Sequence, residues 1–81
     1  MKALVTGASS GIGKDIAIEL SKRGYELILV ARSKEELESV QKELITGSKI
    51  IAMDLSEHNN CYDLYSQVKY DDIDISKIFF A

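Results

Sequence analysis

Apolar and polar positions along the 81-residue chain follow two alternating patterns. Short apolar runs at residues 2–6, 25–31 and 49–53 are typical of strands. The second run is so nearly unbroken that we expect both of its faces to be buried, as in a parallel sheet. Residues 71–81 first alternate and then end in an apolar run, which predicts a fourth strand.

Amphipathic stretches with helical spacing separate these runs. The first covers residues 10–23. The second begins at Ser33, whose spacing to Glu36 is that of a capping box. The third follows Ser56 or Asn59, either of which would cap it. The predicted apolar stripes are Ile12, Ile16, Ala17 and Leu20, then Leu37, Val40 and Leu44, then Cys61, Leu64, Tyr65 and Val68.

The order of these elements predicts an α/β fold. Strands that alternate with helices through short connections form right-handed βαβ crossovers and an open parallel sheet. The chain has no proline, no linker-like segment and no internal repeat that would demand a second domain. We therefore predict one domain over residues 1–81, with the order βαβαβαβ and a sheet between two layers of helices.

Composition and charge narrow the function classes. The chain is 46% hydrophobic and 28% charged, which is typical of a folded protein. Its net charge of −3 and the lack of a basic block argue against nucleic-acid binding. Cys61 has no second cysteine to pair with, which fits a reducing compartment. No apolar run approaches the roughly 20 residues of a membrane span, so we expect a cytoplasmic protein.

A glycine-rich turn lies between the first predicted strand and the first predicted helix. Residues 6–13 read TGASSGIG. The free N–H groups and the positive dipole end of a helix favour phosphate at such a turn. Gly7 would permit the sharp turn, Gly11 a close approach of a pyrophosphate, and Gly13 close packing of the helix. The alternative is a turn that binds nothing. The residues expected at the ligand are Gly7, Ser9, Ser10, Gly11, Ile12 and Gly13.

This turn resembles the TGxxxGxG cofactor loop of the short-chain dehydrogenase/reductase family. The resemblance extends from residue 1 to about residue 75. It implies a Rossmann-like, truncated doubly wound sheet with strand order 3-2-1-4 and a nicotinamide dinucleotide as cofactor. A P-loop is disfavoured, because Gly13 and Lys14 are followed by Asp15 where that motif needs Ser or Thr.

The residue after the second predicted strand bears on which dinucleotide is bound. Proteins selective for NAD carry an acidic residue there, about 20 residues after the loop. Here that place holds Arg32, whose guanidinium suits a 2′-phosphate that a carboxylate would repel. Ser33 adds a hydroxyl, although helix capping competes for it. In the family, arginine at this position implies NADP, and NADP is the cofactor we predict.

Asp54 and Leu55 follow the third predicted strand directly. The resemblance implies that this pair contacts the adenine, with the Asp54 carboxylate accepting a hydrogen bond from the adenine amino group. The alternative is that Asp54 caps the following helix, which is an ordinary use of aspartate. The two roles are compatible.

The family's catalytic residues have no counterpart in this sequence. After Ile75 the chain reads SKIFFA instead of the family's Asn-Asn-Ala-Gly motif. Tyr65 and Lys69 match the spacing of the family's Tyr-x-x-x-Lys pair, but Tyr65 falls on an apolar stripe, so a core tyrosine is the preferred interpretation. His58 has no partners at metal-ligand spacing. We therefore predict no catalytic residue and no metal site.

Two functions follow as hypotheses. The first is the NADP(H)-binding N-terminal portion of a carbonyl reductase or alcohol dehydrogenase, which binds the cofactor without transferring hydride. The alternative is a non-catalytic nucleotide-binding or self-associating module left by gene truncation. In either case the fourth strand would lie at the edge of the sheet, where it is open to another chain. We expect a homo-oligomer formed through that edge.

Overall fold

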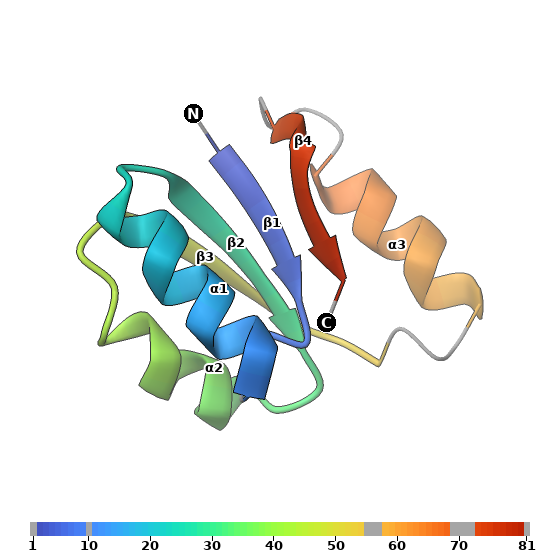
Figure 1. Ribbon diagram of the computed structural model, residues 1–81. Coiled ribbons are helices and arrows are strands. Elements are labelled where there is room, and N and C mark those ends of the chain that lie inside the picture. The colour runs from blue at the N-terminus through green and yellow to red at the C-terminus, as the bar shows by residue number, and fades with distance from the viewer. Residues whose placement is uncertain (1, 10, 55–57, 69–72, 81) are drawn as a thin grey trace.

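The computed structural model describes residues 2–9, 11–54, 58–68 and 73–80 of the chain. Strands and helices alternate throughout, which confirms the predicted order βαβαβαβ. No helix within these residues is long and apolar enough to cross a membrane. The elements, shown in Figure 1, are β1 (Lys2–Thr6), α1 (Gly11–Lys22), β2 (Glu26–Ala31), α2 (Lys34–Gln41), β3 (Ser48–Ala52), α3 (His58–Val68) and β4 (Ile73–Phe80).

The strands form one sheet in the order β3-β2-β1-β4, and every neighbouring pair is parallel. This confirms the predicted order 3-2-1-4. The arrowheads in Figure 1 therefore point the same way, so the carboxyl ends of the strands share one edge of the sheet. The pairing of β1 with β4 is irregular, because Lys2 lies opposite Ile73 whereas Leu4 lies opposite Ile78.

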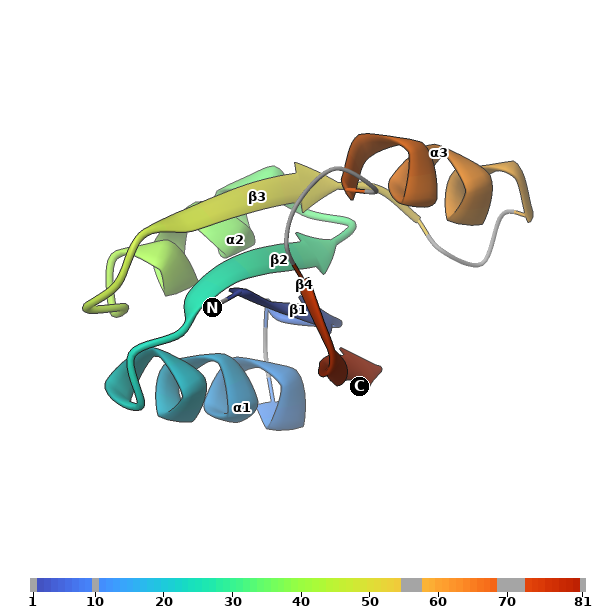
Figure 2. The ribbon, with the colours of Figure 1, turned by 90° about the horizontal axis from the view of Figure 1, so that it is seen from above.

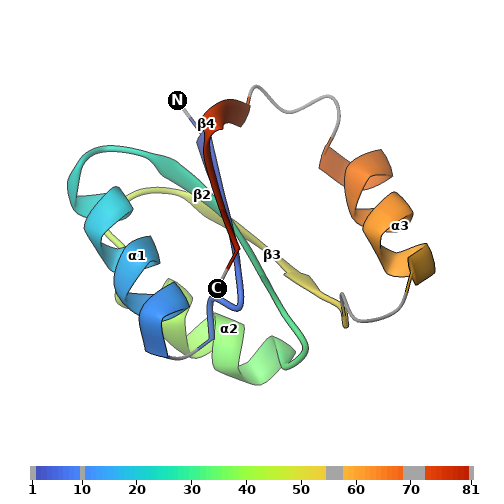
Figure 3. The same cartoon turned by 45° about the vertical axis from the view of Figure 1, so that its right-hand side comes forward.

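Helices cover both faces of this sheet, which confirms the three-layer prediction. The α1–α2 face buries alternate strand residues such as Val5 and Leu29 against Leu37 of α2. The opposite face buries the intervening residues, including Val30, against Leu64 of α3. Figures 2 and 3 show α1 and α3 on opposite sides of β1. The alternation arises because successive side chains of a strand point to opposite faces.

The buried face of α1 differs from the predicted stripe. Ile12 is 74% exposed, so its assignment to the core was wrong, while Ala17 and Leu20 are buried as expected. The helix is rotated so that Gly13 rather than Ile12 faces inward. A glycine is required there because a Cβ on Gly13 would lie 2.0 Å from the Gly7 carbonyl oxygen. This backbone contact fixes the orientation of the helix.

Helix α2 is shorter than its periodicity suggested. We expected it to continue through Leu44, but it ends at Gln41 and Lys42 is its C-terminal cap. Leu44 still packs against the core, although it lies outside the helix. The chain leaves the helix because the backbone N–H groups of Ile45 and Thr46 donate to the buried Ser21 hydroxyl, at 2.8 and 3.1 Å.

Helix α3 begins at His58, so Asn59 lies within the helix and does not cap it. Ser56 lies outside the described residues, as do the side chains of Cys61 and Tyr65. Leu64 is buried against the sheet and Val68 packs beside it, which confirms the part of the predicted stripe that is described.

Candidate functional site

Three connections meet at the carboxyl edge of the sheet, where parallel α/β proteins bind their ligands. The first is the glycine-rich turn between β1 and α1, the second joins β2 to α2, and the third follows β3. Because β1, β2 and β3 are consecutive neighbours in the sheet, the three connections lie in a row. The predicted site residues belong to these three connections and, for Gly11, Ile12 and Gly13, to the first turn of α1.

The glycine-rich turn is tied to β2 as well as to β1. Ala8 is completely buried, and its N–H donates to the Val30 carbonyl at 3.2 Å. Gly7 has φ of 63°, in the region that favours glycine. A Cβ on Gly13 would also lie 2.7 Å from the Gly7 carbonyl carbon. The start of α1 therefore rests directly on the turn, as we predicted for Gly13.

The other side of the turn is open. Gly11 has φ of 59°, and a Cβ built on it would meet no atom within 4 Å. The space that the missing side chain leaves is therefore available to a ligand at the start of α1. Ile12 points out of the core and is exposed there, and Ser9 is half-buried. Ser10 lies outside the described residues.

The connection after β2 presents a cation next to a helix start. Arg32 is exposed and directly follows the last residue of β2. Ser33 caps α2, because its hydroxyl accepts a hydrogen bond from the Glu36 N–H at 3.3 Å. This confirms the serine half of the predicted capping box. The Ser33 hydroxyl is thus already committed to α2, which leaves Arg32 as the stronger ligand candidate of the two.

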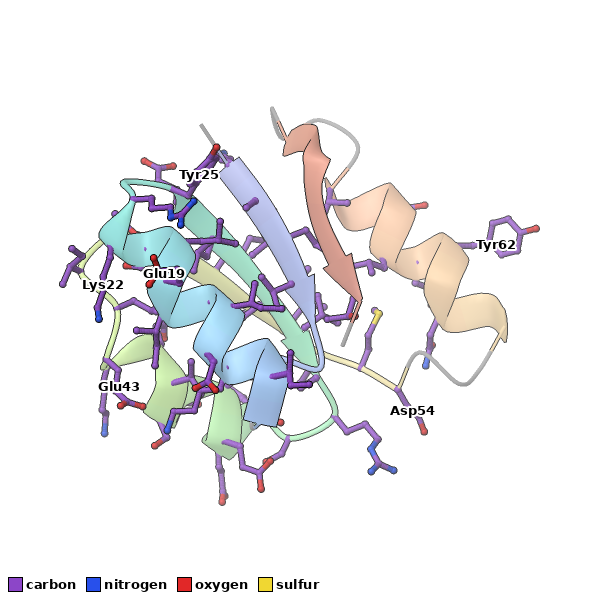
Figure 4. The ribbon with its side chains drawn as sticks, in the orientation of Figure 1. Glu19, Lys22, Tyr25, Glu43, Asp54 and Tyr62 are labelled. Atoms are coloured by element: carbon purple, nitrogen blue, oxygen red, sulfur yellow. The ribbon has the colours of Figure 1, made fainter. Side chains whose placement is uncertain are left out.

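The connection after β3 is held from both sides. The Met53 N–H donates to the Ala31 carbonyl at 2.9 Å, which ties it to β2. The Asn60 side-chain amide donates to the Asp54 carbonyl at 2.6 Å, which ties it to α3. Asp54 is half-buried, and Figure 4 shows its side chain beyond the end of β3, directed away from the sheet. Leu55 lies outside the described residues.

Sequence reasoning selected Asp54 but missed Asn60, which holds it. The sequence pattern favours Asn59 as a helix cap and gives no separate signal for its neighbour Asn60. The described residues contain no group of three or more side chains suited to a metal ion. The glycine-rich turn, the exposed Arg32 guanidinium and the Asp54 carboxylate lie along the carboxyl edge of the sheet.

A parallel sheet with a glycine-rich turn opening a helix at its carboxyl edge defines a Rossmann-type nucleotide-binding fold. The family model described as "short chain dehydrogenase" matches residues 1–75. The chain belongs to the short-chain dehydrogenase/reductase family, a family of oxidoreductases.

Similar proteins include longer reductases. The chain is 42% identical over 81 residues to a very-long-chain 3-oxoacyl-CoA reductase of Coccidioides immitis, with 91% of this chain and 23% of that protein covered. It is 39% identical over 66 residues to an uncharacterised oxidoreductase of Staphylococcus epidermidis, with 82% of this chain and 29% of that protein covered. The chain thus spans less than a third of either relative.

Solved structures show the same fold. A metagenomic short-chain oxidoreductase in complex with NADP superposes with a TM-score of 0.85 at 31% identity, over 98% of this chain and 37% of that one. A 3-oxoacyl (acyl-carrier-protein) reductase from Agrobacterium tumefaciens with NADP bound gives a TM-score of 0.82 at 34% identity, over 90% of this chain and 30% of that one.

Proposed function

We propose that this chain binds NADP(H) through the adenosine side of the cofactor. The glycine-rich turn would hold the pyrophosphate, Arg32 the 2′-phosphate, and the connection after β3 the adenine. These three parts of the ligand are matched by three connections in a row along one edge of the sheet. The proposed ligand residues are Gly7, Ser9, Ser10, Gly11, Ile12, Gly13, Arg32, Ser33, Asp54 and Leu55.

The position of Arg32 carries the choice of NADP over NAD. An exposed guanidinium at the end of β2 lies where the ribose of a dinucleotide would meet the sheet, and it can donate two parallel hydrogen bonds to a phosphate. The neighbouring turn is fixed to the same strand through the Ala8–Val30 hydrogen bond. Both phosphate-binding features therefore share one rigid support. The NADP-bound neighbours support this choice.

We propose further that the longer protein to which such a chain corresponds reduces a carbonyl group with NADPH. The 3-oxoacyl-CoA reductases among the relatives support a 3-oxoacyl thioester as the substrate class. NADPH would supply the hydride to the carbonyl carbon. The residues proposed here bind and orient the adenosine side of the cofactor. None of them is assigned a proton-transfer role, so we expect the 81 residues alone to bind NADPH without reducing a carbonyl.

A variant at Arg32 tests the proposed site. Removal of the guanidinium in Arg32→Ala takes away charge-assisted hydrogen bonds to the 2′-phosphate, so we expect affinity for NADPH to fall about tenfold. Affinity for NADH, which lacks that phosphate, is expected to change little. Isothermal titration calorimetry with both cofactors measures the effect.

Lys34→Ala provides the matched control, because Lys34 is an exposed cation two residues away on the first turn of α2. We expect it to leave both affinities nearly unchanged. An equal loss of NADPH and NADH binding in Arg32→Ala would contradict the role given to Arg32.

A second candidate role is self-association. Strand β4 is an outer strand of the four-stranded sheet, with β1 as its neighbour. The backbone groups on the other side of an outer strand offer hydrogen bonds to another strand. We propose that two copies of the chain pair through β4. This role is compatible with cofactor binding, since all the proposed ligand residues lie outside β4.

A further inference from the structure

Asn60 spans the connection between β3 and α3. It lies in the first turn of α3, and its side-chain nitrogen is 2.6 Å from the backbone oxygen of Asp54. The side chain is half-buried, so solvent competes only in part for this hydrogen bond. The bond closes a span of six residues and fixes where the chain leaves β3.

The same short segment is fixed from the side of β2. The Met53 N–H donates to the Ala31 carbonyl at 2.9 Å, one residue before Arg32. The backbone on either side of the Asp54 Cα is thus bonded to a different element, to β2 at Met53 and to α3 at the Asp54 carbonyl. A backbone held at both flanks fixes the positions of the Asp54 Cα and Cβ, from which the carboxylate projects, and precise recognition requires such a fixed base.

We infer that Asn60 is a positioning residue for adenine recognition, an inference that rests on the proposed binding of NADP(H). By holding the Asp54 backbone, Asn60 directs the Asp54 carboxylate toward the place where the adenine amino group would lie. Asn60 itself touches no part of the cofactor. Figure 4 shows the Asp54 side chain beyond the end of β3, directed away from the sheet.

The chemistry of the amide suits this role. The contact to a carbonyl oxygen requires a donor, which asparagine has and aspartate lacks. Asn60→Asp therefore keeps the size of the side chain but replaces the hydrogen bond with repulsion between two oxygens. Asn60→Ala removes the donor without adding charge. The two variants remove the same contact in different ways, so the inference does not depend on either one alone.

If Asn60 had only a structural role, as a residue that holds α3 on the domain, a different result is expected. Loss of that role would lower the binding affinity of every ligand by the same factor. Loss of a positioning residue would weaken only ligands that carry the adenine amino group. NADPH and its hypoxanthine analogue differ at that group, because the analogue has a carbonyl oxygen where adenine has the amino group.

The experiment is a calorimetric titration of the full 81-residue chain with both dinucleotides. We expect Asn60→Ala and Asn60→Asp to weaken NADPH binding about three- to tenfold. Their affinity for the hypoxanthine analogue is expected to stay within about twofold of the value for the unaltered chain. In a double-mutant cycle, Asn60→Ala is expected to cost little further NADPH affinity once Asp54→Ala is present, because both act on one contact. Ser66→Ala, at an exposed position on the same helix, is the control.

The possible failures are distinct. If the Asn60 variants lose affinity for both dinucleotides by the same factor, or lose affinity for neither, the positioning role is overturned. Equal binding of both dinucleotides by the unaltered chain overturns the Asp54–adenine contact and with it this inference, while the proposed NADP(H) binding stands. Failure of the unaltered chain to bind either dinucleotide overturns both the inference and the proposed function.

Discussion

Two glycines of the same turn serve opposite purposes. Gly11 has a left-handed φ of 59° and open space where a side chain would project, so its lack of a Cβ benefits the backbone conformation and a ligand. Gly13 lacks a Cβ because the Gly7 carbonyl oxygen occupies that place. The first glycine keeps a surface open and the second lets α1 rest on the turn. Gly13 therefore has a packing role in addition to its proposed place in the cofactor-binding turn, whereas the open side of Gly11 faces the proposed site.

Replacement of Gly13 tests this distinction at the residue scale. In Gly13→Ala the new methyl group would lie 2.0 Å from a backbone oxygen, which has no rotamer to escape into. We expect the free energy of unfolding to fall by at least about 1–3 kcal/mol, the usual cost of overpacking. Urea denaturation followed by circular dichroism measures the change.

Gly47→Ala is the control for that experiment. A Cβ there would meet nothing within 4 Å, and Gly47 is not among the glycines with positive φ. We expect its effect to stay within about 0.5 kcal/mol. If Gly13→Ala were as mild as Gly47→Ala, the close packing of α1 on the turn would be refuted.

At the scale of elements, the connection from α2 to β3 depends on α1. The buried Ser21 hydroxyl accepts hydrogen bonds from the N–H groups of Ile45 and Thr46. The Thr46 hydroxyl donates in turn to the Tyr25 carbonyl. Lys14 and Glu43 form an ion pair at 3.0 Å between the same two parts of the chain, but its partial exposure makes its contribution small. Figure 4 shows Glu43 at this junction.

Removal of the Ser21 hydroxyl tests the importance of this junction. Ser21→Ala leaves the N–H groups of Ile45 and Thr46 without their buried acceptor, and we expect a loss of about 1–3 kcal/mol in the free energy of unfolding. Ser39→Ala, at an exposed position of α2, is the matched control, with an expected change within about 0.5 kcal/mol. Thermal or urea unfolding of both variants gives the comparison. A neutral Ser21→Ala would show that the backbone groups find other partners.

The contacts of Ser21 with Ile45 and Thr46 illustrate which features of the fold can be predicted from the sequence and which cannot. Periodicity predicted that α1 and α2 exist, because burial of an apolar stripe is a local pattern. It did not predict the end of α2, which depends on Ser21, a residue 24 positions away from Ile45. Nor did it predict the exposure of Ile12, because the orientation of α1 is decided by the backbone contact between Gly13 and Gly7.

The candidate site likewise contains residues that the sequence predicts and one that it does not. The glycine-rich turn, Arg32 and Asp54 were recognisable because each occupies a fixed place relative to a strand end. Asn60 was not recognisable, because its partner is a backbone carbonyl, and any residue type supplies one. The spacing of six residues between Asn60 and Asp54 matches no recurrent capping or turn pattern, so the sequence gives no signal for this contact.

At the scale of the whole molecule, the two outer strands of the sheet, β3 and β4, differ in how they pair with their neighbours. Strand β3 pairs with β2 in regular register, whereas β4 pairs with β1 through an irregular register between Lys2 and Leu4. We propose β4, rather than β3, as the surface for self-association, because the connection that follows β3 carries proposed ligand residues.

Sedimentation velocity tests that proposal. We expect the sedimentation coefficient to rise with protein concentration toward the value of a dimer, because pairing of two copies obeys mass action. Addition of NADPH is expected to leave this behaviour unchanged, since the proposed ligand residues lie outside β4. A single monomeric species over the whole concentration range would contradict pairing through β4.

The cofactor preference of the unaltered chain decides whether it binds NADP(H) as proposed. Every residue proposed to contact the cofactor lies in the connections after β1, β2 and β3 or in the first turn of α1, and Arg32 is the residue proposed to distinguish the two cofactors. In parallel calorimetric titrations we expect NADPH to bind about tenfold more tightly than NADH, since only NADPH carries the 2′-phosphate. Equal affinities, or tighter binding of NADH, would contradict the account.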